Sequence, residues 1–398
     1  MATLLLAIIY IAFISLGLPD ALLGASWPAM QSEFAVPFGF AGFASMLISG
    51  GTILSSILGT RMLRRFGTGR VTAVSVGLTA AALFGFAAAP SFWWLLIAAV
   101  PLGLGGGAVD SGLNAYVAEH YESRHMSWLH SFWGLGALSG PLLLARLLGH
   151  GASWRGGYLT IAILQSVLVV VLVLAVPLWD KVRRRASSAV PKGAAGAPKS
   201  AAAVQSHQPL FFPLKVKGVK LALVTFFFYC GIESTMGLWG GSYLFKTRGL
   251  DLAAAATWVS MFYASITAGR FLTGFMTYKV SNKDLIRWGA LFVLAGIVLL
   301  VAPLPLPFAL AGFLLAGFGC APIFPCMIHE TPDRFGVANA QAIIGFQMAM
   351  AYIGTTLLPP TFGFIASASS LSLMPFFLLA YIGVLIFSTE KLRKKLAV

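Results

Sequence analysis

Long apolar stretches alternate with short polar segments along the whole chain. Twelve stretches of about twenty residues carry few charges; they lie at 3–30, 38–60, 70–89, 92–118, 128–149, 156–179, 219–245, 252–277, 285–303, 306–328, 338–363 and 369–388. A helix needs about 20 mostly apolar residues to cross a bilayer. We therefore predict an all-α membrane protein with twelve transmembrane helices, the first of which is retained and is not a cleaved signal peptide.

The segment 181–215 interrupts this pattern, because Ala, Ser, Pro, Gly and Lys dominate it. Such a segment cannot bury enough apolar surface to fold, so we predict a flexible linker. The linker divides the chain into an N-terminal six-helix bundle at 1–180 and a C-terminal six-helix bundle at 216–398, which ends in a basic tail.

The two predicted bundles share features at a nearly constant distance along the chain. An acid that precedes a glycine by four residues stands in the first and seventh stretches, and glycines recur in three further pairs of stretches. The matches are 213–215 residues apart: Asp20 with Glu233, Gly59 with Gly274, Gly103 with Gly317, and Gly140 with Gly354. These matches indicate two pseudo-repeats. Parallel six-helix repeats with a central site between them form the major facilitator fold.

Composition and charge distribution agree with this prediction. Hydrophobic residues make up 58% of the chain and charged residues 10%, against roughly 45–50% and 25% in soluble domains, which excludes a soluble enzyme. Of the 27 Lys and Arg residues, 22 follow even-numbered stretches, including those in the linker and the tail. The positive-inside rule then places both termini and the linker in the cytoplasm of a multi-pass plasma-membrane protein. The net charge of +15 is thus explained by topology, and we expect no nucleic-acid partner.

The sequence carries no motif of enzymatic chemistry. It contains no G-x-S-x-G and no P-loop, and the segment that begins at His329 lacks the second histidine of a zinc protease. The cysteines Cys230, Cys320 and Cys326 have no metal-ligand spacing. We expect no enzymatic activity and no cofactor. A transporter without a P-loop must use an ion gradient or run downhill; we favour protons and do not exclude Na⁺.

Four charged residues lie well inside the apolar stretches: Asp20, Asp110, Glu233 and Arg270. A charge at the centre of a membrane helix costs about 2.5–3.5 kcal/mol on insertion scales, so such residues usually face protein or water and have a function. Asp20 follows Pro19 and either caps the distal part of a kinked helix or contacts the solute. Arg270 either neutralises one of the acids or extends its side chain to the membrane interface.

Asp110 belongs to the segment GLGGGAVDSGLN, which runs from Gly103 to Asn114. Asn114 is four residues further on and shares a helix face with Asp110, and the glycines on the same side allow close helix packing. Asp110 is either a hydrogen-bonded carboxyl that fixes this packing or a cavity carboxyl that binds a proton or the solute. Because burial favours the neutral form of a carboxyl, we favour Asp110 as the proton carrier.

Other polar and aromatic side chains at membrane depth are candidate ligands for a small polar solute. Gln347 and His130 are either structural or solute-binding. The indoles of Trp27, Trp133 and Trp239 either belong to interface belts or offer stacking faces. Spacing alone does not decide between these readings.

Three segments resemble the fucose permease-like branch of the major facilitator superfamily, the fucose, galactose and glucose proton symporters. They are LPDALL in the first stretch, GLGGGAVDSGLNAYV in the fourth and SWLHSFWGLGALSGP in the fifth. The resemblance implies alternating access, with Asp20 and Asp110 in proton coupling and sugar recognition and Asn114 at a matching position. It also implies that His130 and Trp133 line the sugar site. The expected partners are the bilayer and a small solute, a monosaccharide in the first place, carried by a monomer.

The sequence also departs from that branch. Glu233 is an additional acid, which we assign to proton coupling or solute contact in the second half. The segment GTRMLRRFGTG has Arg64 where the superfamily's loop signature has an acid, so we expect Arg64, like Arg270, in gating or charge pairing. The segment GALSGP, at 136–141, partly matches the signature of proton-driven drug exporters, and efflux of a drug or metabolite is therefore our alternative. A membrane receptor ranks third.

Overall fold

The protein is almost entirely helical. The computed structural model describes residues 2–121, 123–188 and 212–396, and no residue of these ranges lies in a β-strand. The first half consists of α1 (Ala2–Asp20), α2 (Leu22–Phe34), η1 (Phe38–Phe40), α3 (Ala41–Phe66), α4 (Thr68–Ala87), α5 (Phe92–His120), α6 (Ser123–Gly149) and α7 (Trp154–Ser188). The second half consists of η2 (Phe212–Lys215), α8 (Val219–Arg248), α9 (Leu252–Met276), α10 (Asn282–Val301), α11 (Leu306–His329), α12 (Thr331–Phe335), α13 (Val337–Ala368), η3 (Leu371–Leu373) and α14 (Met374–Leu396).

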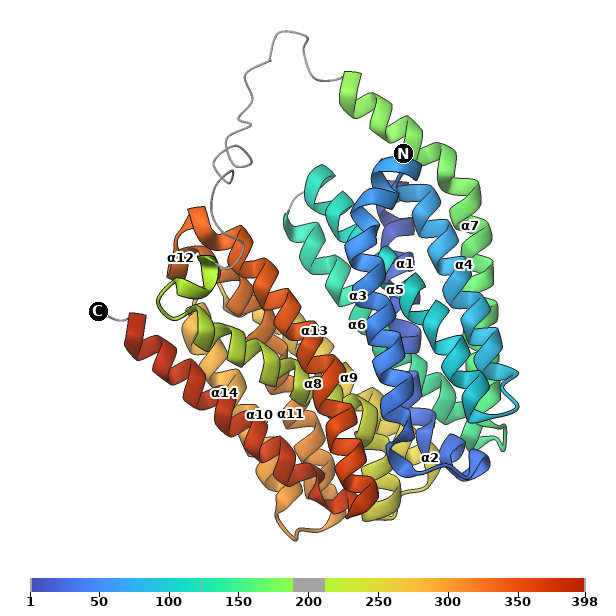
Figure 1. The fold of residues 1–398 in the computed structure, drawn as a ribbon, viewed down its shortest axis with the longest axis vertical. Coiled ribbons are helices and arrows are strands. Elements are labelled where there is room, and N and C mark those ends of the chain that lie inside the picture. Colours follow the sequence, from blue (N-terminus) through green and yellow to red (C-terminus); the bar gives the residue numbers. More distant parts are fainter. Residues whose placement is uncertain (1, 122, 189–211, 397–398) are drawn as a thin grey trace.

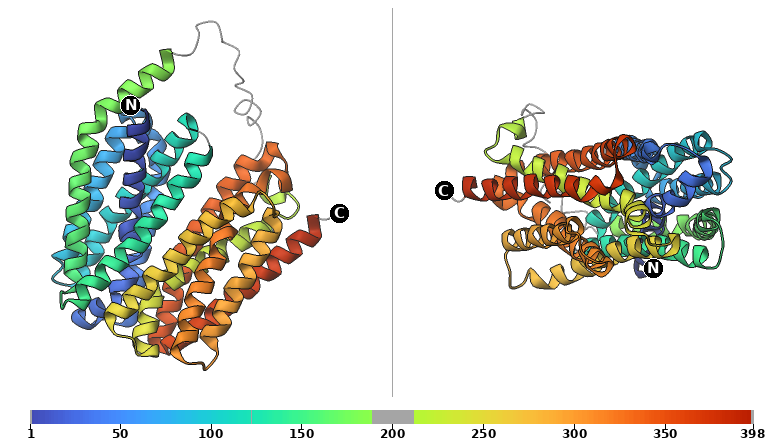
Figure 2. Two further views of the ribbon diagram at one scale, coloured as in Figure 1. Left: turned by 180° about the vertical axis from the view of Figure 1, so that it is seen from behind. Right: turned by 90° about the horizontal axis from the view of Figure 1, so that it is seen from below.

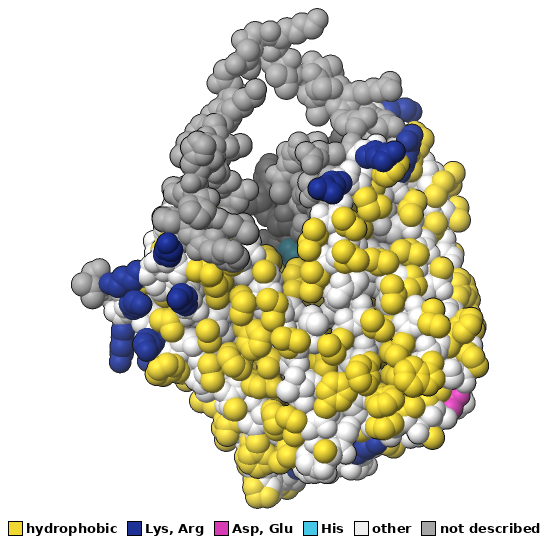
Figure 3. Space-filling model, viewed as in Figure 1, with side chains coloured by type: hydrophobic (Ala, Val, Ile, Leu, Met, Phe, Trp, Pro, Cys, Tyr) yellow, Lys and Arg dark blue, Asp and Glu magenta, His cyan; other side chains and the backbone are white. Residues whose placement is uncertain are grey.

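Twelve membrane-spanning segments can be identified within these described residues, as the hydrophobic pattern predicts. Each is long and apolar enough to cross a bilayer, and α1 and α2 together form the first of them. Exposed leucine, isoleucine, valine and phenylalanine side chains cover the outside of these helices, as the space-filling view shows (Figure 3). An outer surface of this kind belongs in lipid, so the chain is a multi-pass membrane protein.

The helices form two bundles that stand side by side (Figures 1 and 2). In the first half α1 packs on α6, α3 on α5, and α4 on α5 and α7. In the second half α8 packs on α13, α9 on α11, and α10 on α11 and α14. Helices that occupy corresponding places in the two halves thus make corresponding contacts, which is the packing expected of two repeats.

The glycines that match between the halves mark the same helix crossings in each. A Cβ on Gly103 of α5 would overlap a backbone carbonyl of α3, and one on Gly317 of α11 would overlap a backbone carbonyl of α9. Gly140 and Gly354 likewise lie against the backbones of α1 and α8. Small residues let the helices approach this closely. Gly274, in contrast, faces open space, so its match with Gly59 has no packing role there.

The first apolar stretch differs from the prediction, because two helices form it instead of one. α1 ends at Asp20, and α2 begins at Leu22 after a turn at Ala21. Pro19 explains the interruption, since proline has no N–H for the helix ladder and its ring crowds the preceding turn. The break places Asp20 at a helix end inside the membrane.

The connection between the halves also differs in part from the prediction. α7 continues to Ser188, well beyond position 181, where the sequence pattern predicts a flexible linker. A 3-10 turn, η2, forms part of the predicted linker before α8. The rest of that segment, 189–211, lies outside the described residues. We call the end of the molecule at which α7 ends and α8 begins the linker end.

The two halves contact one another away from the linker end. There, a Cβ on Gly24 of α2 would overlap the carbonyl of Gly237 on α8, and the Gly39 N–H donates to Ser367 Oγ at 2.5 Å. Nearer the middle, Ser260 Oγ of α9 donates to the carbonyl of Leu138 on α6 at 2.5 Å. At the linker end the surface is hollowed between the halves (Figure 3). The molecule is therefore open at the linker end and closed at the opposite end.

Candidate solute-binding site

The break between α1 and α2 places the carboxylate of Asp20 opposite α6. Asp20 is exposed although it lies far inside a membrane-spanning segment. Its Oδ2 accepts a hydrogen bond of 2.7 Å from the indole Nε1 of Trp133. The turn that follows has no side-chain cap, so the carboxylate is used for contact with α6 and does not cap α2.

A charge pair from the second half lies next to this contact. The Arg270 guanidinium of α9 is 5.5 Å from the centroid of the Trp133 ring, within the range of a cation–π interaction. Its Nη2 lies 3.6 Å from Glu233 Oε2 of α8, with 17% and 16% of the two side chains exposed. Tyr229, one helical turn before Glu233, donates to the same carboxylate oxygen. Arg270 therefore neutralises an acid and does not extend to the membrane interface.

Asp110 lies on α5, close enough to Asp20 for the two carboxylates to interact electrostatically. It is half-buried, and its Oδ1 accepts a hydrogen bond of 2.9 Å from Asn114 Nδ2 on its own helix. Tyr352 of α13 approaches from the second half, within reach of Ser56 and close enough to Asp110 to interact electrostatically. Because the described hydrogen bond of Asp110 stays within α5, it does not tie two helices together.

Two further side chains complete the cluster between the halves. His130, one turn before Trp133, is exposed and lies near Arg270. Tyr263 of α9 lies close to Asp20, Glu233 and Arg270. The structure thus brings together seven of the residues singled out from the sequence, from five different helices: Asp20, Asp110, Asn114, His130, Trp133, Glu233 and Arg270. We call this set, with Tyr229, Tyr263 and Tyr352, the central cluster.

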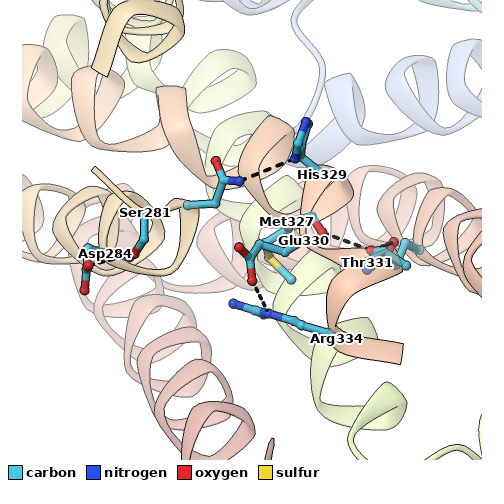
Figure 4. Close-up of polar contacts among 9 residues, drawn as sticks. Ser281, Asp284, Met327, His329, Glu330, Thr331 and Arg334 are labelled. Atoms are coloured by element: carbon cyan, nitrogen blue, oxygen red, sulfur yellow. Dashed lines mark hydrogen bonds and ion pairs between the residues drawn. The ribbon is translucent and has the colours of Figure 1, made fainter. Parts of the chain in front are cut away.

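Two residues that the sequence suggested as solute ligands lie elsewhere. Gln347 is 1% exposed and accepts a hydrogen bond of 3.0 Å from Thr331 Oγ1. Thr331 belongs to a group of polar contacts in the second half that also includes Glu330 and Arg334 (Figure 4). Trp239 is fully buried; its Nε1 donates to the carbonyl of Pro359 at 2.7 Å, and its ring packs 4.5 Å from that of Phe38 across the closed end.

Two other predictions concern residues away from the cluster. Trp27 is buried and donates to the carbonyl of Phe38 at 3.0 Å, so it does not belong to an interface belt. The backbone of Arg64 lies in α3, but its side chain is outside the described part of the chain, so its predicted gating role stays a prediction.

The three tyrosines of the central cluster escaped the sequence analysis. Tyrosine is common in apolar stretches, and an isolated one carries no functional signal. Tyr229 alone offered a clue, because it stands four residues before Glu233 and therefore on the same helix face. Tyr263 and Tyr352 join the cluster only because the two bundles meet.

The GALSGP segment has a packing role in this structure. A Cβ on Gly136 or Gly140 of α6 would overlap the backbone carbonyls of Ile14 and Leu18 on α1. The glycines therefore bring α6 against α1, which places Trp133 beside Asp20.

Two six-helix repeats that enclose a charged cluster at mid-depth, open from one end, define a membrane transporter in which the solute site lies between the repeats. The sequence profile of the Major Facilitator Superfamily matches residues 9–359. The chain belongs to this superfamily, and it is a transporter and not an enzyme.

Individual relatives share about a quarter of their residues with the chain. "Bypass of stop codon protein 6" of Saccharomyces cerevisiae is 23% identical over 96% of this chain and 80% of its own length. The cis,cis-muconate transport protein of Acinetobacter baylyi is 24% identical (92% and 87%). The glucose/mannose transporter GlcP of Bacillus subtilis is 25% identical (72% and 67%). The names of these relatives include two different kinds of solute.

Solved structures support the fold. A bacterial homologue of the lysosomal transporter Spinster, in an inward-facing and unoccupied conformation, superposes with a TM-score of 0.76 at 13% identity and covers 99% of this chain and 98% of its own. A D-xylose-proton symporter gives 0.74 at 16% identity, over 98% and 97%. At these identities the likeness concerns the fold alone.

Proposed function

We propose that the protein is a proton-coupled symporter of a small neutral polar solute, a monosaccharide in the first place, that works by alternating access. In this proposal the linker end faces the cytoplasm. The observation that carries the proposal is the central cluster, in which carboxylates, tyrosine hydroxyls and an indole from both halves surround one space.

The charges of the cluster favour a neutral solute. Glu233 is compensated by Arg270, whereas no ion pair within the described residues involves Asp20 or Asp110. An anionic solute would meet two uncompensated carboxylates at short range, which is unfavourable in a partly desolvated site. A sugar instead donates hydroxyl hydrogens to these carboxylates, accepts from tyrosine hydroxyls and lays its apolar face on an indole such as Trp133.

The same two carboxylates provide the means for proton coupling. A carboxyl in a space that opens to one side of the membrane at a time can bind a proton on one side and release it on the other. One proton that crosses 100 mV supplies about 2.3 kcal/mol, enough for roughly fifty-fold accumulation at 1.4 kcal/mol per decade. Asp110 is our first choice for the carrier, and Asp20, bonded to Trp133, for recognition.

Two similarities support a sugar. The sequence resembles the sugar symporters of the fucose permease-like branch at the segments that supply Asp20, Asp110 and Trp133, and one relative is named a glucose/mannose transporter.

Proton-driven efflux of an organic cation is the second candidate. The observation that favours it is again the pair of uncompensated carboxylates, because Asp20 and Asp110 would attract a cation as well as hydrogen-bond a sugar. The GALSGP segment, which partly matches the signature of proton-driven drug exporters, packs α6 on α1.

Uptake into proteoliposomes tests the proposal. A panel of neutral monosaccharides is offered with an inward pH gradient, an inward Na⁺ gradient or none, to the native protein, Asp110→Asn and Glu390→Gln. Glu390 is the matched control, because its carboxylate pairs with Arg287 and Arg393 at the protein surface. We expect accumulation of a sugar that follows the pH gradient in the native protein and in Glu390→Gln. Asp110→Asn should retain sugar exchange and lose accumulation.

Three results would overturn parts of this proposal. If the sugar accumulates only when a Na⁺ gradient is imposed, the coupling ion is Na⁺ and not the proton. Full accumulation by Asp110→Asn would remove that residue from coupling. If no sugar moves and preloaded lipophilic cations leave the vesicles when the pH gradient is imposed, efflux takes the place of symport.

A further inference from the structure

A buried glutamine joins three helices of the first half behind the central cluster. Gln165 of α7 is 1% exposed. Its amide Nε2 donates to the backbone carbonyl of Ser15 on α1 at 2.8 Å, and its Oε1 accepts from Thr79 Oγ1 on α4 at 2.7 Å. Both ends of the amide are therefore engaged, and neither contact involves the solute space.

The carbonyl that Gln165 reaches is one that α1 cannot satisfy in the regular way. In an α-helix the carbonyl of residue 15 accepts from the N–H of residue 19. Residue 19 is proline, which has no N–H, so the Ser15 carbonyl lacks this donor. A buried carbonyl without a partner is costly, and the Gln165 amide takes the place of the missing N–H.

The position of this bond connects it with Asp20. The proline-containing turn between Ser15 and Asp20 is the last turn of α1, and the direction of that turn sets where the Asp20 carboxylate points. On the opposite side, α6 lies against the same turn so closely that a Cβ on Gly17 would overlap the carbonyl of Trp133. The turn is thus held by Gln165 on one side and by α6 on the other.

We propose that Gln165 is a positioning residue for Asp20: by replacing the hydrogen bond that Pro19 removes, it fixes the last turn of α1 and holds the Asp20 carboxylate against Trp133. The role of Asp20 in transport rests on the proposed function. The placement of Asp20 by Gln165 is a separate matter and can be tested without a solute.

A double-mutant cycle tests the replacement of the hydrogen bond. Gln165→Leu keeps the volume of the side chain and removes the amide, and Pro19→Ala restores a backbone N–H for the Ser15 carbonyl. We expect Gln165→Leu to lower the melting temperature in detergent by about 2–4 °C, and to have little effect in the Pro19→Ala background. Pro101→Ala, in the middle of α5, is the matched control and should leave the effect of Gln165→Leu unchanged. Equal losses with and without Pro19 would overturn the proposal.

The fluorescence of Trp133 tests the effect on Asp20. The contribution of this indole is obtained as the difference between each protein and its Trp133→Phe counterpart. We expect Gln165→Leu to shift this contribution in the same direction as Asp20→Asn, because both disturb the bond between Asp20 and the indole. Ser166→Ala, which removes only a hydroxyl bonded within α7, should keep the native emission.

Transport adds a second readout for the same variants. Gln165→Leu should raise the solute KM about tenfold at a similar maximal rate, because a misplaced carboxylate binds more weakly. Native emission in Gln165→Leu would show that Gln165 is structural only and would overturn the proposal. Should the native protein move no sugar while Gln165→Leu shifts the emission, the proposed function fails and the positioning role stands.

Discussion

The ion pair between Arg270 and Glu233 allows a sharp test of the electrostatics of the central cluster. The two members differ in how they respond to the loss of a partner. If Arg270→Gln removes the guanidinium, the Glu233 carboxylate can become neutral by binding a proton. If Glu233→Gln removes the carboxylate, the guanidinium stays charged, because arginine is not deprotonated in proteins. We therefore predict that Glu233→Gln destabilises the protein more than Arg270→Gln.

The magnitude follows from the geometry. At 3.6 Å, two unit charges in a medium of effective dielectric constant 20 attract by about 4–5 kcal/mol. Because about one sixth of each side chain is exposed (17% and 16%), and because desolvation opposes the attraction, the net coupling should be smaller, about 2–3 kcal/mol. The double variant Arg270→Gln/Glu233→Gln should then be less destabilised than the sum of the single variants by this amount.

Thermal unfolding of the four proteins in one detergent measures the coupling. The control is the same cycle on Arg287 and Glu390, which pair at 3.0 Å with 49% and 28% exposed; exposed pairs contribute about 0–1 kcal/mol. Strictly additive losses at Arg270 and Glu233, or a coupling no larger than that of the exposed pair, would refute the reasoning. A larger loss in Arg270→Gln than in Glu233→Gln would refute the asymmetry.

Three further predictions follow from the structure. Trp133→Phe removes the hydrogen bond from the indole to Asp20 and should raise the solute KM about tenfold. Trp128→Phe, on the same helix but 46% exposed, should leave the KM unchanged; the KM of each variant is measured by uptake kinetics. Gly24→Ala places a methyl group on a carbonyl of α8 and should lengthen the distance between spin labels on α2 and α8, while Gly50→Ala, which meets open space, should leave it unchanged. Gln347→Ala removes the acceptor of the Thr331 hydroxyl, so it should lower the free energy of unfolding by about 1–3 kcal/mol and leave the solute KM unchanged. A raised KM would show that Gln347 takes part in solute binding.

The spanning helices and their pairing between the two halves were predictable from local sequence. Each stretch is apolar over the thickness of a bilayer, so its helical state follows from the need to satisfy every backbone group within lipid. The glycines near Gly103 and Gly317 were recognisable because a crossing as close as theirs excludes a side chain, and a repeated fold repeats that exclusion. Pro19 indicated an interruption near Asp20, although the sequence analysis predicted a single helix where the structure has α1 and α2.

The members of the site were predictable only in part. Charged residues in lipid-soluble stretches are conspicuous, because an uncompensated charge there is costly, and Asp20, Asp110, Glu233 and Arg270 do meet in one cluster. Gln347 and Trp239 were predicted as ligands on the same grounds of depth and chemistry, and both are buried in contacts of the protein with itself. Membrane depth is a property of position in the sequence, whereas the direction of a side chain depends on the neighbouring helices.

The sequence by itself determined that the chain crosses a membrane twelve times, that its halves repeat, and which charges lie inside the bilayer, since these properties are fixed by each helix and its solvent. Only the tertiary structure decided which acid is paired with Arg270, that Asp20 bonds to Trp133, and that a glutamine from α7 completes the broken turn before Asp20. These contacts join residues more than thirty positions apart. They arise because glycine-lined helices pack closely enough to bring such residues together.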